Sequence, residues 1–244
     1  MAGKAFFIDT SLCIGCRGCQ IACKQWNELP GTKTTNWGSF QNPKDLSPWT
    51  YKLVRFSEHL GQDNKPVWYF FPEQCRHCLE PPCKEVADSQ VKGGIVIDEA
   101  TGAVIYTEAL KKAKAKEIID ACPFNVPRVD EKSGLMTKCT MCIDRVSNGL
   151  VPACVKTCIT GAMNFGDREK MVELAKKRLQ EVKAKYPKAQ VTGLDDLRVF
   201  YLLLDEPKKY YEYAQAQPTF AGIDRSQALR RMVSELGGLA KALT

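Results

Sequence analysis

The sequence predicts an α+β fold in which short strands and helices are arranged around metal-binding loops. The chain has 244 residues and 12 cysteines, and the cysteines fall into four groups separated by segments of strand-like or helix-like pattern. The first group, in residues 13–23, has the spacing C-x2-C-x2-C-x3-C, which is typical of ligands to 4Fe–4S clusters. Such clusters take the place of apolar side chains, so we expect the chain to fold around them.

Apolar segments of strand length flank the cysteine groups. Residues 4–9 predict a strand that enters the first ligand loop, and residues 163–165 predict the strand that follows the last group. Turn residues between apolar stretches predict two-stranded hairpins elsewhere. The other expected strands are residues 51–57 and 67–71, a hairpin over 94–107 that turns at 99–102, and a hairpin over 128–136.

Two segments have helical character. Residues 108–121 are rich in lysine and predict one continuous helix, whereas residues 169–185 carry an apolar stripe that we expect to pack against the body of the protein. The stripe consists of Met171, Leu174, Ala175, Leu179 and Val182. Residues 26–50 contain three tryptophans and three prolines, which favours an ordered loop packed on this chain or on a partner.

The cysteines divide into three sets of four if the crosswise pairing of two-cluster ferredoxins holds. In that pairing, three cysteines of one run share a cluster with the last cysteine of the partner run. The first set is Cys13, Cys16, Cys19 and Cys158; the second set is Cys23, Cys139, Cys142 and Cys154; the third set is Cys75, Cys78, Cys83 and Cys122. With four thiolates for each cluster, the sequence predicts three 4Fe–4S clusters.

Cys122 is the only cysteine of its group. A complete run ending there would have cysteines where the sequence has Lys112, Ala115 and Ile118, and a complete second run would have one at Ala87. All four missing ligands belong to one crosswise set. We therefore interpret the chain as a four-cluster plan from which one cluster has been lost.

These motifs resemble, over nearly the whole chain, the four-cluster ferredoxin subunits of molybdopterin oxidoreductases. The segments that carry the resemblance are residues 75–83, 121–128 and 137–142. Three clusters without a membrane tail are most similar to the beta, or small, subunits of soluble tungsten- or molybdenum-dependent formate dehydrogenases. One departure is Ile159, where the family usually has proline.

The resemblance implies an electron-transfer subunit that has no catalytic residues of its own. Its expected partners are a large molybdopterin or tungsten catalytic subunit, in a heterodimer, and a soluble acceptor such as a c-type cytochrome. A polysulfide, thiosulfate or dimethyl sulfoxide reductase, or a hydrogenase, is the alternative identity of the catalytic subunit. A free-standing polyferredoxin is a further alternative, which the tryptophan-rich insertion and the long tail disfavour.

The resemblance also divides the chain into two pseudo-repeated ferredoxin-like modules with loop insertions. Residues 1–25 and 137–167 are expected to form the first module, with two clusters. Residues 26–136 are expected to form an inserted second module, with one cluster present and one lost. Residues 168–244 would form a helical C-terminal extension that clamps the partner subunit.

Two other uses of the cysteines compete with clusters. Structural zinc sites could take the C-x2-C pairs two at a time, but the third ligand of the first run would remain unexplained. Disulfides require an oxidising compartment, and cysteines three residues apart are poorly placed for several simultaneous bridges.

The formal net charge of +7 does not indicate a nucleic-acid partner. A 4Fe–4S cluster with four thiolates carries about −2, so three clusters would bring the loaded protein close to neutral. We find no aromatic and basic recognition motif. Basic residues beside the ligands would favour the reduced clusters, unless they are ordinary solvated surface. These residues are Arg17, Lys24, Arg76, Lys84, Lys138, Arg145 and Lys156.

No stretch of the sequence reaches the roughly 20 apolar residues of a membrane span, and the N-terminus shows no secretory signal. The resemblance nevertheless implies a periplasmic location, because related complexes are exported folded on a twin-arginine signal of the large subunit. A cytoplasmic location is the alternative.

His77 lies between two cysteines of the third set, so we expect it within a few ångströms of that cluster. It could tune the cluster's potential, with plain solvent exposure as the alternative.

Overall fold

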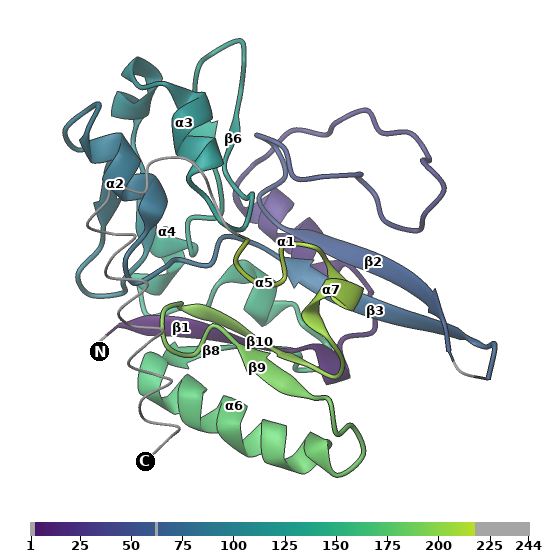
Figure 1. Ribbon diagram of the computed structural model, residues 1–244. Coiled ribbons are helices and arrows are strands. Elements are labelled where there is room, and N and C mark those ends of the chain that lie inside the picture. Colours follow the sequence, from purple (N-terminus) through teal and green to yellow (C-terminus); the bar gives the residue numbers. More distant parts are fainter. Residues whose placement is uncertain (1–2, 62, 218–244) are drawn as a thin grey trace, which may run out of the picture.

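The computed structural model of the protein describes residues 3–61 and 63–217. A mixed sheet and a long helix form one end of the molecule, and small hairpins and short helices form the other (Figure 1). The strands are β1 (Lys4–Asp9), β2 (Leu53–Leu60), β3 (Pro66–Glu73), β4 (Ile95–Ile97), β5 (Val104–Tyr106), β6 (Arg128–Val129), β7 (Met136–Thr137), β8 (Met163–Asp167), β9 (Gln190–Thr192) and β10 (Val199–Leu203). The helices are η1 (Thr10–Leu12), α1 (Gly18–Trp26), α2 (Pro82–Asp88), η2 (Glu108–Lys112), α3 (Ala115–Asp120), α4 (Ile143–Val146), α5 (Ala153–Lys156), α6 (Arg168–Lys183) and α7 (Pro207–Tyr210).

The central sheet has the strand order β8-β1-β10-β9. Strand β1 pairs antiparallel with β8 and parallel with β10. Its side chains alternate between the two faces: Phe6 and Ile8 pack in the same core as Cys19 and Cys154, whereas Phe7 packs toward α6. Because both faces are covered, β1 is apolar along most of its length.

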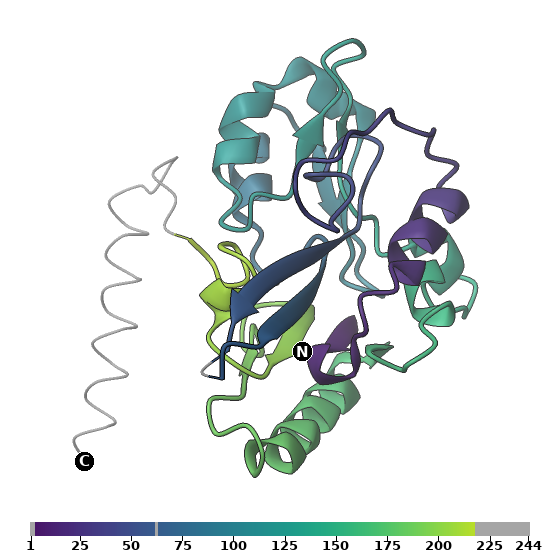
Figure 2. The ribbon, with the colours of Figure 1, turned by 90° about the vertical axis from the view of Figure 1, so that its right-hand side faces the viewer.

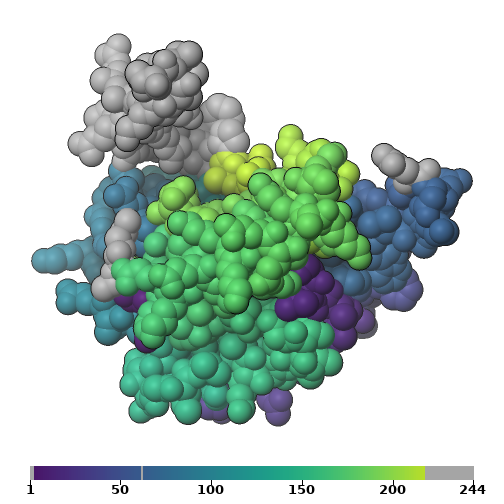
Figure 3. All heavy atoms as spheres, turned by 90° about the horizontal axis from the view of Figure 1, so that it is seen from below, coloured from purple at the N-terminus to yellow at the C-terminus, as the bar shows by residue number. Residues whose placement is uncertain are grey.

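Helix α6 covers the outer face of this sheet, as the views from the side and from below show (Figure 1, Figure 3). The predicted apolar stripe is confirmed, since Ala175 is fully buried among the other four stripe residues. These residues recur at helical spacing, so a single face of the helix meets the strands.

The sheet crosses the boundary drawn at residue 168 in the sequence. Strands β9 and β10 follow that boundary, yet they lie in the same sheet as β1 and β8. Residues 168–217 therefore complete the sheet that begins in the first module. The division into modules stays a prediction, and the part of the expected extension beyond residue 217 lies outside the described residues.

The two hairpins expected over residues 94–107 and 128–136 are confirmed, as β4 with β5 and β6 with β7. The strands expected over residues 51–57 and 67–71 are also confirmed, and as β2 and β3 they pair with each other along their full length. The β2–β3 hairpin extends away from the sheet at the right of Figure 1 and faces the viewer in Figure 2.

The prediction of one continuous helix over residues 108–121 is wrong. The segment forms a short 3-10 helix, η2, and a separate α-helix, α3, with extended backbone at Ala113 and Lys114 between them. The amide of Lys114 donates to the side chain of Gln90, at 2.7 Å, instead of to a carbonyl of the preceding turn. The interruption lets Leu110 and Ile118 pack into the same apolar core.

Residues 27–52 contain no helix or strand, as expected for the insertion. Its second half packs on the body of the chain through buried Gln41, Leu46 and Thr50, whereas Trp37 remains 40% exposed. Within the described ranges, no helix combines the length and the apolar character needed to cross a bilayer.

Candidate metal centres

All 12 cysteines lie within the described residues, and all are free thiols. They lie on short helices or in the loops beside them: Cys19 and Cys23 are one turn apart on α1, Cys83 is on α2, and Cys122 follows α3. The disulfide alternative is therefore not realised in this structure.

The thiols of the first set are close neighbours. Burial raises the pKa of the Cys13 thiol to about 11, and charges on Cys19 and Cys158 add to that rise. Cys158 follows α5 and is the last cysteine of the last run, so its position beside the first run is the one that crosswise pairing requires. Cys16 is exposed at the surface.

The second set has the same kind of proximity. Burial raises the pKa of the Cys23 thiol well above its usual value, and Cys139, Cys154 and Cys142 contribute to the rise, in that order. Cys23 therefore lies with the cysteines of the last run, although only one helical turn separates it from Cys19.

The third set surrounds a cavity. Its four cysteines line one small pocket, together with Tyr106, Lys138 and the prolines that flank Cys83 and Cys122. In residues 3–61 and 63–217, no three His, Cys, Asp or Glu side chains converge closely enough to hold a single metal ion. The four converging thiols fit a multi-iron cluster, although the assignment of ligands to clusters stays a prediction.

Three of the cysteine loops share one backbone conformation. In each loop the residue two positions after the first cysteine has a positive φ: 66° at Gly15, 46° at His77 and 63° at Met141. The amides of His77 and Met141 each donate to the sulfur of the preceding cysteine, at 3.4 Å, and the amide of Gly15 acts on Cys13 in the same way. Amide donors that point at sulfur stabilise the thiolate form.

Burial raises the pKa of most of the thiols, which favours their protonated form as long as no metal ion is bound. It raises the pKa of Cys122 and of Cys139 to about 12 in each case. Iron binds thiolates, so loading a cluster would release these protons and compensate the buried charge.

Two lysines are buried among the three sets. Lys52 is 1% exposed and Lys138 is 5% exposed. Burial alone would lower the pKa of Lys52, but the thiolates of Cys19 and Cys154 attract its charge and the pKa is raised. Sequence reasoning missed Lys52, because a single lysine at the start of a strand is usually solvated.

Arg76 and His77 are also buried, so solvent exposure is the wrong alternative for both. Arg76 is 1% exposed and its guanidinium lies over the rings of Phe71, Phe124 and Tyr201, at 4.8–5.1 Å from their centroids. His77 is fully buried and its Nδ1 accepts from the amide of Val104 at 3.0 Å. Burial lowers the pKa of His77 well below its usual value.

Apolar packing occupies the region of the missing fourth set. Ala87 and Ile118 are fully buried in one apolar core, and Ala115 packs against it. Three of the four positions that lack cysteine are thus in contact with the same core, while Lys112 is exposed. Side chains that pack together in place of thiols are what the loss of one complete cluster predicts.

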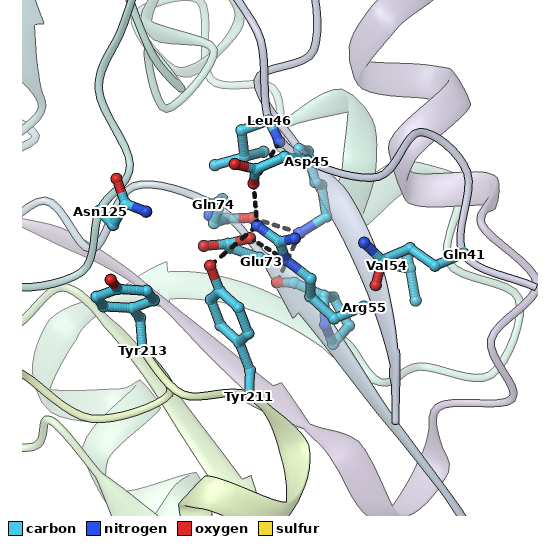
Figure 4. Close-up of polar contacts among 12 residues, drawn as sticks. Gln41, Asp45, Leu46, Val54, Arg55, Glu73, Gln74, Asn125, Tyr211 and Tyr213 are labelled. Atoms are coloured by element: carbon cyan, nitrogen blue, oxygen red, sulfur yellow. Dashed lines mark hydrogen bonds and ion pairs between the residues drawn. The ribbon is translucent and has the colours of Figure 1, made fainter. Parts of the chain in front are cut away.

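Arg55 is the centre of a network of polar contacts next to the third set of cysteines (Figure 4). The Arg55 guanidinium bonds Glu73 at the end of β3, Asp45 of the insertion and the hydroxyl of Tyr211. Asp45 also pairs with Arg128, at 2.8 Å. The network joins five segments of the chain, and its member Glu73 lies two residues before Cys75, where the third ligand loop begins.

Residues 66–168 match the family of 4Fe–4S dicluster domains. The chain is 51% identical over 214 residues to formate dehydrogenase 2 subunit beta (cytochrome c-553) of Nitratidesulfovibrio vulgaris, which covers 86% of this chain and 98% of that protein. It is also 51% identical to formate dehydrogenase subunit beta of Megalodesulfovibrio gigas, with coverage of 87% and 99%. The nitrate-inducible formate dehydrogenase iron–sulfur subunit of Escherichia coli is 39% identical, with coverage of 86% and 72%.

Proposed function

The chain belongs to the family of beta, or iron–sulfur, subunits of formate dehydrogenases, and we propose that it carries three 4Fe–4S clusters between a catalytic subunit and a soluble acceptor. The catalytic subunit would oxidise formate at a molybdopterin-bound tungsten or molybdenum. This chain would perform no bond-making itself. Its role is to receive single electrons at one end of a row of clusters and to release them at the other.

The observation that supports the proposal is that the second set of cysteines has a neighbour in each of the other two sets. A charge on Cys19 of the first set acts on Cys154 of the second, and a charge on Cys75 of the third acts on Cys139 of the second. We therefore propose that the second cluster lies between the other two, in a row. A row of closely spaced clusters is the arrangement that electron transfer requires.

The surface at the first set suits a large protein partner. Ile14 is 58% exposed and Ile159 is 77% exposed, beside the ligands Cys13, Cys16 and Cys158. The rings of Phe40 and Trp68 are in tilted contact nearby, with centroids 5.0 Å apart, and are 62% and 40% exposed. Exposed apolar and aromatic side chains around a redox centre support docking of the catalytic subunit at this end.

The surface at the third set suits a basic carrier. A groove of about 650 Å³ is lined by the ligand Cys78 and by Glu80, Asp195 and Asp196. Acidic side chains would steer a positively charged redox protein toward the cluster. This supports a c-type cytochrome as acceptor, and the name of the Nitratidesulfovibrio vulgaris relative includes cytochrome c-553. We propose a periplasmic location, reached by co-export with the large subunit.

The test is to purify the native protein without oxygen and to identify the large chain that accompanies it. Three cubanes require 12 iron and 12 acid-labile sulfur for each copy of this chain. The complex should reduce a c-type cytochrome with formate and not with hydrogen, and it should not reduce polysulfide, thiosulfate or dimethyl sulfoxide. Zinc with little iron would refute the cluster assignment, and a partner of another activity would refute the formate assignment.

A further inference from the structure

Lys52 and Lys138 are buried lysines that donate only to neutral oxygen atoms. The Nζ of Lys52 donates to Oε1 of Gln74 at 2.5 Å and to the carbonyl of Pro72 at 3.4 Å. The Nζ of Lys138 donates to the carbonyls of Val104 and Cys139, and it lies 4.7 Å from the centroid of the Tyr106 ring. Within the described part of the chain, no carboxylate forms an ion pair with either lysine.

A buried ammonium without a counter-ion is costly. Removing a charge from water costs several kcal/mol unless an opposite charge is close. Hydrogen bonds to carbonyl oxygens satisfy the N–H donors but supply no full negative charge. The groups that can supply it here are the thiolate-bound clusters, each of which carries about −2 when oxidised and one more negative charge when reduced.

Each lysine lies at a junction between two neighbouring sets of cysteines. Val54, two residues after Lys52, packs in one core with Cys19 of the first set and Cys154 of the second, and Lys138 directly precedes Cys139 of the second set. Lys52 opposes the effect of burial on the pKa of thiols in both the first and the second set, namely Cys13, Cys19, Cys23, Cys142 and Cys154. Lys138 does the same for Cys139 of the second set and Cys83 of the third. It also lines the cavity of the third set.

We propose that Lys52 and Lys138 are the counter-charges of the two junctions, and that each raises the reduction potentials of the two clusters that it separates. The inference rests on the three-cluster function proposed above. An electron arriving on a cluster adds a negative charge that the nearby ammonium attracts. Because each lysine lies close to two clusters, it stabilises the electron on either of them. The free-energy difference between the states before and after the transfer therefore stays small.

The middle cluster is the only one that both lysines face. It therefore gains the largest positive shift from them, while the first cluster depends on Lys52 and the third on Lys138. This gives each lysine its own pattern of effects over the three clusters. A general loosening of the fold would not reproduce such a pattern.

The experiment is a redox titration of the complete complex, followed by electron paramagnetic resonance, for Lys52→Met and Lys138→Met. We expect Lys52→Met to lower the potentials of the first and second clusters and to leave the third unchanged. We expect Lys138→Met to lower those of the second and third and to leave the first unchanged. Each shift should be at least a tenfold change in the ratio of reduced to oxidised cluster, which is 59 mV for one electron.

Lys170→Met is the matched control, because Lys170 is 76% exposed on α6 and should leave all three potentials unchanged. Potentials that stay at the control values in both buried variants, or that all move together, would overturn the inference. Lys52→Gln is the second variant at the buried site, and loss of iron from both Lys52 variants would make the lysine a folding determinant and also overturn it. Fewer than 12 iron in the unmodified complex would instead refute the proposed function.

Discussion

The Nε atom of Arg55 donates to Oε2 of Glu73 at 2.6 Å, across the hairpin of β2 and β3. Both side chains are buried, with 8% and 0% of their surface exposed. Glu73 ends β3 two residues before Cys75, so this ion pair fixes the strand at the point where the third ligand loop begins. The contact therefore links the hairpin to the geometry of the third set.

Replacing Arg55 by methionine should destabilise the protein, because it leaves the carboxylate of Glu73 buried and unpaired. Breaking a buried ion pair costs about 3–5 kcal/mol, which for a chain of this size lowers the thermal midpoint by roughly 6–20 °C. The measurement is thermal unfolding of the cluster-loaded protein. Lys65→Met is the control, because its ion pair with Asp63 is exposed and should contribute little to stability. Equal effects of the two substitutions would contradict the importance assigned to Arg55.

The hydroxyl of Tyr69 should make the stability of the protein fall as the pH becomes alkaline. Its hydroxyl donates to Asp205 at 2.9 Å, and burial, together with that carboxylate, raises the pKa of Tyr69 to about 12. The unfolded chain releases the proton near pH 10, so the stabilisation is complete below pH 10 and is lost as pH rises toward 12. Between those values the thermal midpoint of Tyr69→Phe should fall less steeply with pH than that of the unmodified protein. Parallel curves would show that the hydroxyl does not titrate in this way.

Much of the fold could be predicted because local patterns determine it. The strand at residues 4–9, the hairpins and the stripe on α6 each depend on side-chain periodicity or on turn residues over a short stretch. The prediction of one helix over residues 108–121 was wrong because the interruption depends on Gln90, whose side chain accepts a hydrogen bond from the amide of Lys114. The parallel pairing of β1 with β10 joins segments nearly 200 residues apart, and no local pattern contains that information.

The candidate site likewise has features that the local sequence predicts and features that depend on distant residues. The cysteine spacing alone predicts the ligands, because a cluster imposes strict distances on its thiolates, and their assignment to clusters stays a prediction. The positive φ at His77 and Met141 could not be foreseen, since neither is glycine and the conformation is imposed by the ligand loop. The burial of Lys52 was equally hidden, because it depends on Gln74 and on cysteines of two distant segments.

Cys23→Ser tests the crosswise pairing. Its thiol lies with Cys139, Cys142 and Cys154, so the substitution should damage the second cluster and leave the first spectroscopically intact. The measurement is the resonance spectrum of the reduced complex, together with its iron content. Cys16→Ser is the comparison, because Cys16 belongs to the neighbouring first set and lies close to Cys19. If both variants lose the same signal, Cys23 and Cys16 serve one cluster and the pairing is wrong.

Cys83→Ser tests the direction of electron flow. The second set is the middle of the row, because Cys19 lies close to Cys154 and Cys75 lies close to Cys139. The third set lies at the end that borders the acidic groove, and the chain lacks the ligands of a fourth cluster beyond it. The third cluster should therefore be the last before the acceptor.

In the assembled complex, Cys83→Ser should abolish reduction of the natural acceptor while formate still reduces an artificial dye at the catalytic subunit. Formate should also still reduce the first and second clusters in this variant. In the matched variant Cys16→Ser, at the other end of the row, the second and third clusters should stay oxidised when formate is added. If Cys83→Ser instead leaves the first and second clusters oxidised, or removes dye and acceptor reduction equally without loss of assembly, the third cluster lies upstream. Electrons would then enter beside the acidic groove and leave beside the exposed ligand Cys16.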